Sequence, residues 1–450
     1  MRRIIMLTMV LISAVAFANG TNEATATGGK KVIELTMFYM NEQERFELLE
    51  QAAVALNEHL AADNVEIKLI NDHYAGSNRA EWRNNLSMRV VSGNAPELMA
   101  HSHANIPFFV EADYVKQVDD IINSPAYADA VQVLKETAMY KGHYYAIPMD
   151  IEARNIWYSK DNLRKIGLTD SDFDRMFEES LTGDFTMDDF LSLCQRVKNA
   201  GVSDYVFTHR PVTGPENPMT AMHFGCVFMD EKTGKLQLHK AAMEKNLQFY
   251  YDNVYTYGFT PAEMMDMSWD EISNVWATHK TTFWLGGVWN RHTLVRFTDY
   301  DETTSMDHWG IFMLPALEKG GKPLSVSNPY YYYISSKISD EKYKYAKMLF
   351  EEAAKPQYAV PYAIKSSHLA FNTRSAQDPA YKKDAHLSRS YHMLEFSVTE
   401  PHHEKFPIFS DVLTEAMSAV EHKKMSPAQA VDYMEKSLLS QMPDDIIILK

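Results

Sequence analysis

The sequence predicts an α/β protein of two or three domains, of which the first is a parallel sheet covered by helices, with a crevice between domains. The chain has 450 residues, which is too long for a single compact core at the usual ~150 residues per domain. Short β-type runs alternate with longer amphipathic runs, and this order is typical of helix-covered parallel sheets. Pro148 then breaks the pattern and leads into an extended run, where we place the first crossing between the lobes.

The first elements form β-α-β units. The opening strand is β-branched and aromatic, the first helix repeats apolar residues at helical spacing, and the second strand alternates. Ligands of open parallel sheets bind beyond the carboxyl ends of the strands. These ends fall at residues 39–42, 72–79 and 101–105. The predicted elements are a strand at 31–39, a helix at 43–62, a strand at 65–70, a helix at 79–92 and a strand at 97–100.

The remaining elements follow the extended run that begins after Pro148. Apolar residues at helical spacing predict several long helices, and one β-branched and aromatic stretch predicts a strand. The helices are expected at 187–200, 241–257, 341–354, 408–420 and 427–439, and the strand at 324–335.

The first 18 residues are typical of a secretory signal peptide. Arg2 and Arg3 precede an apolar run that ends in Ala16-Phe17-Ala18. A membrane anchor is the alternative, but the run is shorter than the ~20 residues of a spanning helix. Residues 19–30 are small and polar, so we expect a flexible tether. The cleavage site has no cysteine for lipidation, and we expect a soluble periplasmic protein.

Cys194 and Cys226 are the two cysteines of the chain. They could pair in an oxidising compartment, but two buried free thiols are favoured, because sequence alone does not bring their Cα atoms within bridging distance.

Charge and motifs exclude several classes of function. The net charge of −16 repels phosphate backbones, so we expect no nucleic-acid partner. The sequence lacks GxSxG, Walker A, HExxH and GxGxxG motifs, which lowers the expectation of an enzyme. His101 and His103 could chelate a metal, but 17 histidines make such pairs by chance, and a zinc site needs three or four converging ligands. We expect no metal and no cofactor.

Six short segments occur in a fixed order along the chain. They are residues 90–97 (VVSGNAPE), 141–148 (KGHYYAIP), 157–163 (WYSKDNL), 185–190 (FTMDDF), 281–289 (TTFWLGGVW) and 426–430 (SPAQA). Together they resemble the extracellular solute-binding proteins of ABC importers, in the branch that captures sugars and oligosaccharides. Glu97 stands where that family usually has aspartate, and Thr186 is placed to cap a helix.

The resemblance implies the two-lobed periplasmic-binding-protein fold, in which each lobe is a mostly parallel sheet flanked by helices and several hinge crossings join the lobes. Residues 31–150 and 316–365 would form lobe I, and residues 151–315 and 366–450 would form lobe II. The implied function is capture of a sugar or oligosaccharide between the lobes of a monomer, and delivery to ABC permease subunits by hinge closure. The alternatives are a non-sugar solute such as a polyamine, polyol phosphate or metal chelate, and a secreted glycan-degrading enzyme.

Sugar recognition needs aromatic faces and planar polar groups. The resemblance implies a stacking residue at the position after the two glycines. A run of alternating charges in the extended segment after Pro148 shares one side of that segment. Polar residues also follow the predicted strands, where ligands of open sheets bind. A run of four tyrosines alternates sides, so two of its rings could face the crevice, and one of these is taken as a candidate. The candidate ligand-binding residues are Trp289, Asp150, Glu152, Arg154, Tyr39, Asn41, His101 and Tyr331.

Overall fold

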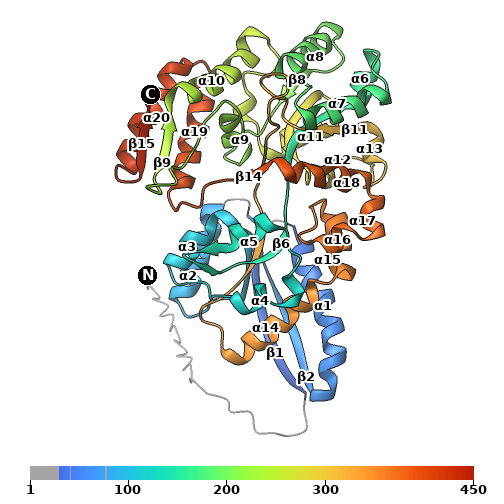
Figure 1. Ribbon diagram of the computed structural model, residues 1–450, viewed down its shortest axis with the longest axis vertical. Helices are drawn as coiled ribbons and strands as arrows, with labels where there is room; N and C mark the ends of the chain where they lie inside the picture. The colour runs from blue at the N-terminus through green and yellow to red at the C-terminus, as the bar shows by residue number, and fades with distance from the viewer. Residues whose placement is uncertain (1–29, 41, 77–78) are drawn as a thin grey trace, which may run out of the picture.

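The computed structural model describes residues 30–40, 42–76 and 79–450, which form two α/β lobes stacked along the long axis (Figure 1). The predicted signal peptide, the tether up to residue 29 and the candidate Asn41 lie outside the described residues. Within the part of the chain that is described, no helix combines the length and apolar character needed to cross a membrane.

The first lobe contains a five-stranded sheet of order β2-β1-β3-β13-β6, in which only β13 runs against its neighbours. Successive residues of β1 face opposite sides, as strand geometry requires. Phe38 stacks on Trp82 of α2, and Tyr39 stacks on Phe46 of α1. Helices α1 and α2 therefore cover opposite faces. The bounds are β1 (Lys31–Met40), α1 (Glu44–Leu60), β2 (Val65–Tyr74), α2 (Arg79–Val91), β3 (Leu98–Ser102), α3 (Ile106–Glu111), α4 (Asp119–Ile122), α5 (Gln132–Ala138), β4 (Met139–Tyr140), β5 (His143–Tyr144), β6 (Ile147–Asp150), β13 (Tyr330–Ile334), α14 (Asp340–Ala353), α15 (Pro356–Ser366), α16 (Thr373–Ala376) and α17 (Pro379–Lys383).

The second lobe contains a four-stranded sheet of order β11-β7-β10-β8, in which β7 is the reversed strand. Each lobe is thus a mostly parallel sheet flanked by helices, as predicted, and its one reversed strand is the strand that enters from the hinge. The bounds are β7 (Arg154–Ser159), α6 (Lys160–Lys165), α7 (Asp170–Thr182), α8 (Met187–Ala200), β8 (Tyr205–Thr208), α9 (Glu216–His223), β9 (Leu236–His239), α10 (Lys240–Tyr251), α11 (Trp269–Ala277), β10 (Thr281–Gly287), α12 (Asn290–Phe297), α13 (Ser305–His308), β11 (Trp309–Phe312), β12 (Ser325–Ser327), α18 (Ala385–His392), β14 (Ser397–Thr399), α19 (Phe406–Glu421), α20 (Pro427–Gln441) and β15 (Ile446–Leu449).

Two predicted elements differ from the observed ones. The strand expected at 324–335 is divided into β12 and β13, because Pro329 has no N–H to donate to a ladder. The helix expected at 241–257 ends as α10 and continues as a π-helical turn over Asp252–Thr256. Thr186 caps α8 as expected, since its side chain accepts a hydrogen bond from the N–H of Asp189.

The chain crosses between the lobes three times. The first crossing, residues 151–153, directly follows β6. Residues 316–324 still contact the second lobe, where Ala316 pairs with Thr186, and the chain reaches the first sheet only at Tyr330. Residues 366–383 remain with the first lobe, where Asn372 pairs with Ala130. The boundaries drawn at 316 and 366 therefore precede the observed crossings, because strand pairing holds these connecting segments to the lobe they leave.

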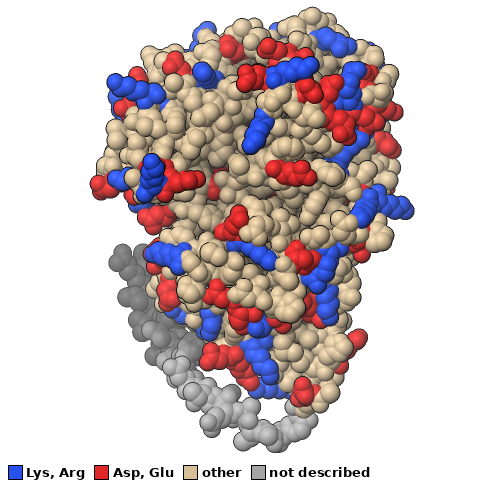
Figure 2. All heavy atoms as spheres, viewed as in Figure 1, with Lys and Arg blue, Asp and Glu red and all other residues tan. Residues whose placement is uncertain are grey.

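Cys194 and Cys226 are free, buried thiols, and they lie in separate hydrophobic cores of the second lobe. Cys194 packs beside the sheet, whereas Cys226 lies under α19 and α20. Charged side chains of both signs are interspersed over the face shown in Figure 2.

Candidate functional site

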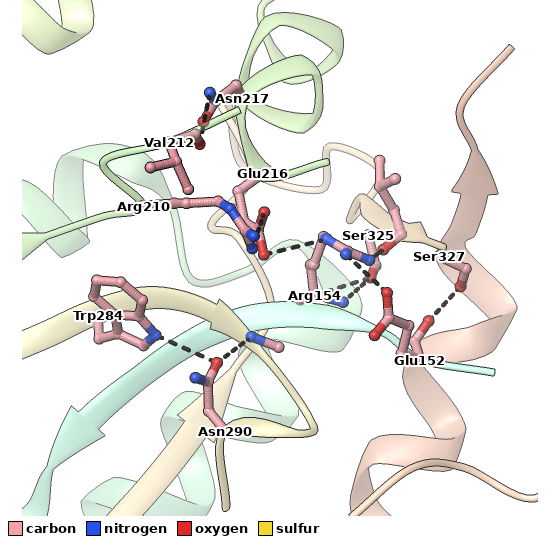
Figure 3. Close-up of polar contacts among 12 residues, drawn as sticks. Glu152, Arg154, Arg210, Val212, Glu216, Asn217, Trp284, Asn290, Ser325 and Ser327 are labelled. Atoms are coloured by element: carbon pink, nitrogen blue, oxygen red, sulfur yellow. Dashed lines mark hydrogen bonds and ion pairs between the residues drawn. The ribbon is translucent and has the colours of Figure 1, made fainter. Parts of the chain in front are cut away.

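Arg154 is the centre of a buried charge network where the lobes meet. Its Nη2 donates to Glu152 Oε1 at 2.8 Å, its Nη1 donates to the carbonyl of Val326 at 2.9 Å, and its Nε lies 3.5 Å from Glu216 Oε1. Arg210 Nη1 lies 3.4 Å from the other oxygen of Glu216. Figure 3 shows Arg154 between the two carboxylates. We call Glu152, Arg154, Arg210 and Glu216 the Arg154 network.

Burial makes the charges of this network depend on one another. Arg154 is only 2% exposed, and Glu152 and Glu216 are also buried. Burial raises the pKa of Glu152, although Arg154 opposes this shift. Burial alone would lower the pKa of Arg154, but Glu152 and Glu216 outweigh it and raise that pKa. The network therefore keeps a permanent cation between two carboxylates in a low-dielectric seam.

Trp289 adds an aromatic face to this network. The Arg154 guanidinium lies 4.8 Å from the centre of its ring, which is cation–π distance. The turn between β10 and α12 places the ring, because Asn290 Oδ1 accepts hydrogen bonds from the N–H of Gly287 and from Trp284 Nε1 (Figure 3). A second pair of the same kind lies nearby, where the Arg210 guanidinium is 4.6 Å from the ring of Trp269.

A second buried network surrounds Arg45 of α1. Arg45 forms an ion pair with Glu42, lies 3.8 Å from Asp150 and covers the ring of Tyr330 at 3.8 Å. The hydroxyl of Tyr362 donates a short hydrogen bond to Asp150. Burial would lower the pKa of Arg45, but its acidic neighbours, Glu42 first, raise it well above the usual value. His368 connects the two networks, because its Nε2 lies 3.9 Å from Glu152 and its ring stacks on Tyr362 with centres 6.5 Å apart.

The two lobes touch through a pair of histidines. His103 follows β3 in the first lobe, His402 precedes α19 in the second, and their ring centres are 5.2 Å apart. Burial lowers the pKa of His402 to about 4. Burial also holds the pKa of His103 well below its usual range, and His402 contributes to that shift. The closed seam therefore favours two neutral imidazoles.

The structure brings some predicted site residues together and separates others. Glu152, Arg154 and Trp289 form one cluster, and Asp150 belongs to the neighbouring Arg45 network. His101 is fully buried, and it lies 4.6 Å from Trp82 and 6.0 Å from Tyr330, ring centre to ring centre.

Tyr39 and Tyr331 lie in the core of the first lobe. Tyr39 stacks on Phe46, and its hydroxyl donates to Asn71 Oδ1 at 3.2 Å. The Tyr331 hydroxyl donates to the carbonyl of Leu134 at 2.9 Å. The ring at the seam is that of its neighbour Tyr330, which lies under Arg45. A run of identical residues gives no sign of which alternate positions face the seam, so the sequence could not distinguish the two.

Sequence reasoning missed Arg45, Arg210, Glu216 and Tyr362. A signal existed for Arg45, since it shares the buried stripe of α1 with Leu48, Leu49 and Ala52 at spacings of three, four and seven. A charged residue in phase with an apolar stripe indicates a buried partner. Arg210 and Glu216 lie in or just after a loop with no periodicity, and only the tertiary fold brings them to Arg154.

Gly287 sets the position of the Trp289 ring. A Cβ on Gly287 would lie 1.8 Å from Cζ3 of Trp289, so Gly287→Ala must displace the ring. We expect a loss of about 1–3 kcal/mol of unfolding free energy and a shifted tryptophan emission maximum, measured by urea denaturation and fluorescence. Gly76→Ala is the control, because its Cβ would meet only the flexible, partly exposed ring of Tyr74. Equal behaviour of the two variants would contradict the packing described.

Two α/β lobes closed over a buried polar and aromatic seam define a solute-binding protein. The chain belongs to the bacterial extracellular solute-binding protein family, whose model matches residues 49–360. It is 21% identical to the maltotriose-binding protein of Pyrococcus abyssi over an alignment of 369 residues. This alignment covers 81% of this chain and 71% of that relative.

Solved structures share the fold at low sequence identity. Maltose-bound MalE3 of T. maritima matches with a TM-score of 0.74 at 16% identity, over 91% of this chain and 100% of that one. The GacH receptor of Streptomyces glaucescens matches with a TM-score of 0.73 at 15% identity, over 92% and 99% of the two chains. The two-lobed fold expected from the sequence is confirmed.

Proposed function

We propose that this protein captures a sugar or oligosaccharide between its lobes and delivers it to the permease subunits of an ABC importer. The observation that carries the proposal is the Trp289 ring beside the Arg154 network. Aromatic rings stack on the apolar faces of sugar rings, and planar charged groups bond pairs of hydroxyls. The relatives named above include proteins that bind maltose and maltotriose.

Hinge closure supplies the mechanism. Glu152 and Arg154 lie at the first crossing, whereas Trp289 and Glu216 belong to the second lobe. A solute that contacts both lobes binds the closed state more tightly than the open state, and this difference in affinity shifts the equilibrium toward closure. The permease would then recognise the closed, loaded form. We further propose export to the periplasm by residues 1–18, action as a monomer, and no chemical turnover of the solute.

Trp289→Ala tests the proposal. We expect it to weaken binding of the best maltodextrin in a thermal-shift screen by about tenfold or more, because a lost aromatic stacking face is worth roughly 0.5–1.5 kcal/mol beyond area burial, with the lost burial added. Trp289→Phe is the matched control, since it keeps an aromatic face and should bind more tightly than the alanine variant. Isothermal titration calorimetry measures both. Equal affinity of wild type and Trp289→Ala would remove Trp289 from the site.

A glycan panel separates binding from catalysis. A ligand that binds only the native state raises the melting temperature as its concentration rises. We expect this rise without release of reducing ends. Release of reducing ends would show a glycan-degrading enzyme, and a rise in melting temperature with a polyamine but with no sugar would show a non-sugar solute.

A further inference from the structure

We propose that the second lobe carries a binding site for a divalent transition-metal ion, such as Zn²⁺, formed by Asp161, His279 and His308. The ligand atoms of these three side chains all lie within 4.8 Å of one another. His308 Nδ1 is 2.7 Å from Asp161 Oδ2, and His279 Nε2 is 3.7 Å from the same oxygen. Two imidazoles and one carboxylate are a common ligand set for zinc.

Two of the three ligand separations are close to those around a tetrahedral ion. Zinc bonds of 2.0–2.2 Å place adjacent tetrahedral ligand atoms ~3.3 Å apart. One observed separation, 2.7 Å, is slightly shorter and the other, 3.7 Å, is slightly longer. The third separation, between the ligand atoms of His279 and His308, is at most 4.8 Å, so side-chain rotations are needed to bring all three atoms to the ion. Three protein ligands leave one position for water. The Tyr300 hydroxyl hydrogen-bonds His279 Nε2 at 3.2 Å, and a bound ion would displace this hydroxyl toward that water.

Outer contacts hold His279 and Asp161 in position. His279 Nδ1 lies 2.7 Å from Ser159 Oγ, which also accepts from the N–H of Asn162 at 3.1 Å. A hydroxyl can accept two hydrogen bonds, so Nδ1–H of His279 can donate to Ser159 and leave the Nε2 lone pair for a cation. Arg164 Nη1 lies 3.4 Å from Asp161 Oδ1, the carboxylate oxygen that does not face the histidines. Such partners orient ligands in known metal sites.

The imidazole rings are also fixed by packing and by backbone conformation. The ring of His279 stacks on Trp309 with centres 4.6 Å apart, and the ring of His308 stacks on Tyr300 at 4.5 Å. His279 has a φ of 60°, the left-handed region that few residues other than glycine adopt. Backbone strain of this kind occurs at functional sites.

The site would join three elements of the second lobe. Asp161 lies in α6, His308 ends α13, and His279 lies in the turn that leads into β10; α6 and α13 lie side by side at the right of the upper lobe in Figure 1. Strands β7 and β10 both extend between this region and the seam: β7 begins at Arg154 and ends at Ser159, and the antiparallel β10 ends at Gly287. A bound ion would tie together the far ends of the two strands that present the Arg154 network and Trp289.

Calorimetric titration of metal-free protein with ZnCl2, with no sugar present, tests the site. We expect one equivalent of Zn²⁺ to bind, and at least a tenfold loss of affinity in each of His308→Ala and Asp161→Asn. Ser159→Ala should weaken binding by ~10-fold or more through loss of the outer contact to His279. Cobalt substitution should give the visible absorption of a four-coordinate ion.

His143→Ala is the matched control, because His143 also lies beside a carboxylate, 2.9 Å from Asp119, but at an exposed position in the first lobe. Its zinc affinity should equal that of the wild type. Near-UV circular dichroism shows whether each variant is folded. If His308→Ala does not fold, Asp161→Asn still tests the site, because it keeps the size of the side chain. Absence of zinc binding to the wild type at 100 μM, or equal affinity in Asp161→Asn, would overturn the proposal.

Discussion

Replacing Arg154 with methionine should lower the free energy of unfolding by about 3–5 kcal/mol, the usual cost of leaving a buried charge without its partner. Methionine keeps much of the length of arginine but removes the cation, so the buried Glu152 and Glu216 both lose their contact with it. The carbonyl of Val326 also loses its donor. Urea denaturation followed by circular dichroism measures the change.

A triple variant provides the internal control. Combining Arg154→Met with Glu152→Gln and Glu216→Gln removes the three fully buried charges of the network and leaves only Arg210, whose side chain is 17% exposed. Replacing a buried ionic group as a whole is often neutral. We expect this variant to recover most of the lost stability. Lys68→Met is the surface control, since Lys68 and its partner Glu34 are each 55% exposed and an ion pair in solvent contributes little to stability. If Arg154→Met were no more harmful than Lys68→Met, the Arg154 network would not stabilise the seam.

The fold was largely predictable because its elements carry local signals. The apolar spacing of α1 and the alternation of β2 gave both the type and the approximate ends of these elements. Pro329 is the local signal for the break between β12 and β13, because it has no N–H for a ladder, but the β-type residues on both sides of it predict one strand. The later crossings could not be placed in this way, because they depend on pairings such as Ala316 with Thr186, which are 130 residues apart.

The candidate site was predictable only where neighbours along the chain share a face. Glu152 and Arg154 alternate on one side of an extended segment and do bond each other. Their third partner, Glu216, lies 62 residues further along the chain, and no local pattern connects it to Arg154. Charges that are far apart in the sequence come together only in the folded chain. The sequence therefore predicts the two neighbouring members of the network, and only the structure identifies the distant ones.

Acidification should open the seam and destabilise the closed protein. In solvent, in the open or unfolded state, a histidine has a pKa near 6.5, whereas the pKa of His402 in the closed seam is about 4. As pH falls from about 6.5 to 4, the open state binds a proton that the closed state does not. Each such histidine therefore lowers the stability of the closed state by about 1.4 kcal/mol per pH unit. We expect the radius of gyration, measured by small-angle X-ray scattering, to increase between pH 7 and pH 4.5.

After burial, the charged groups that lower the pKa of His103 are His402 and Arg154. His103 faces His402, the positive charge of Arg154, the side chain of Asn328 and the backbone of Glu400. Protonating both rings would add two positive charges beside Arg154. His402→Gln cannot titrate and should flatten the increase in radius. His223→Gln is the matched control, because burial also lowers the pKa of His223 to about 4, but α9 places it within the second lobe. His223→Gln should make unfolding less sensitive to acid and leave the opening of the lobes unchanged. If the wild type and His402→Gln opened with the same pH profile, the histidine pair would not control closure.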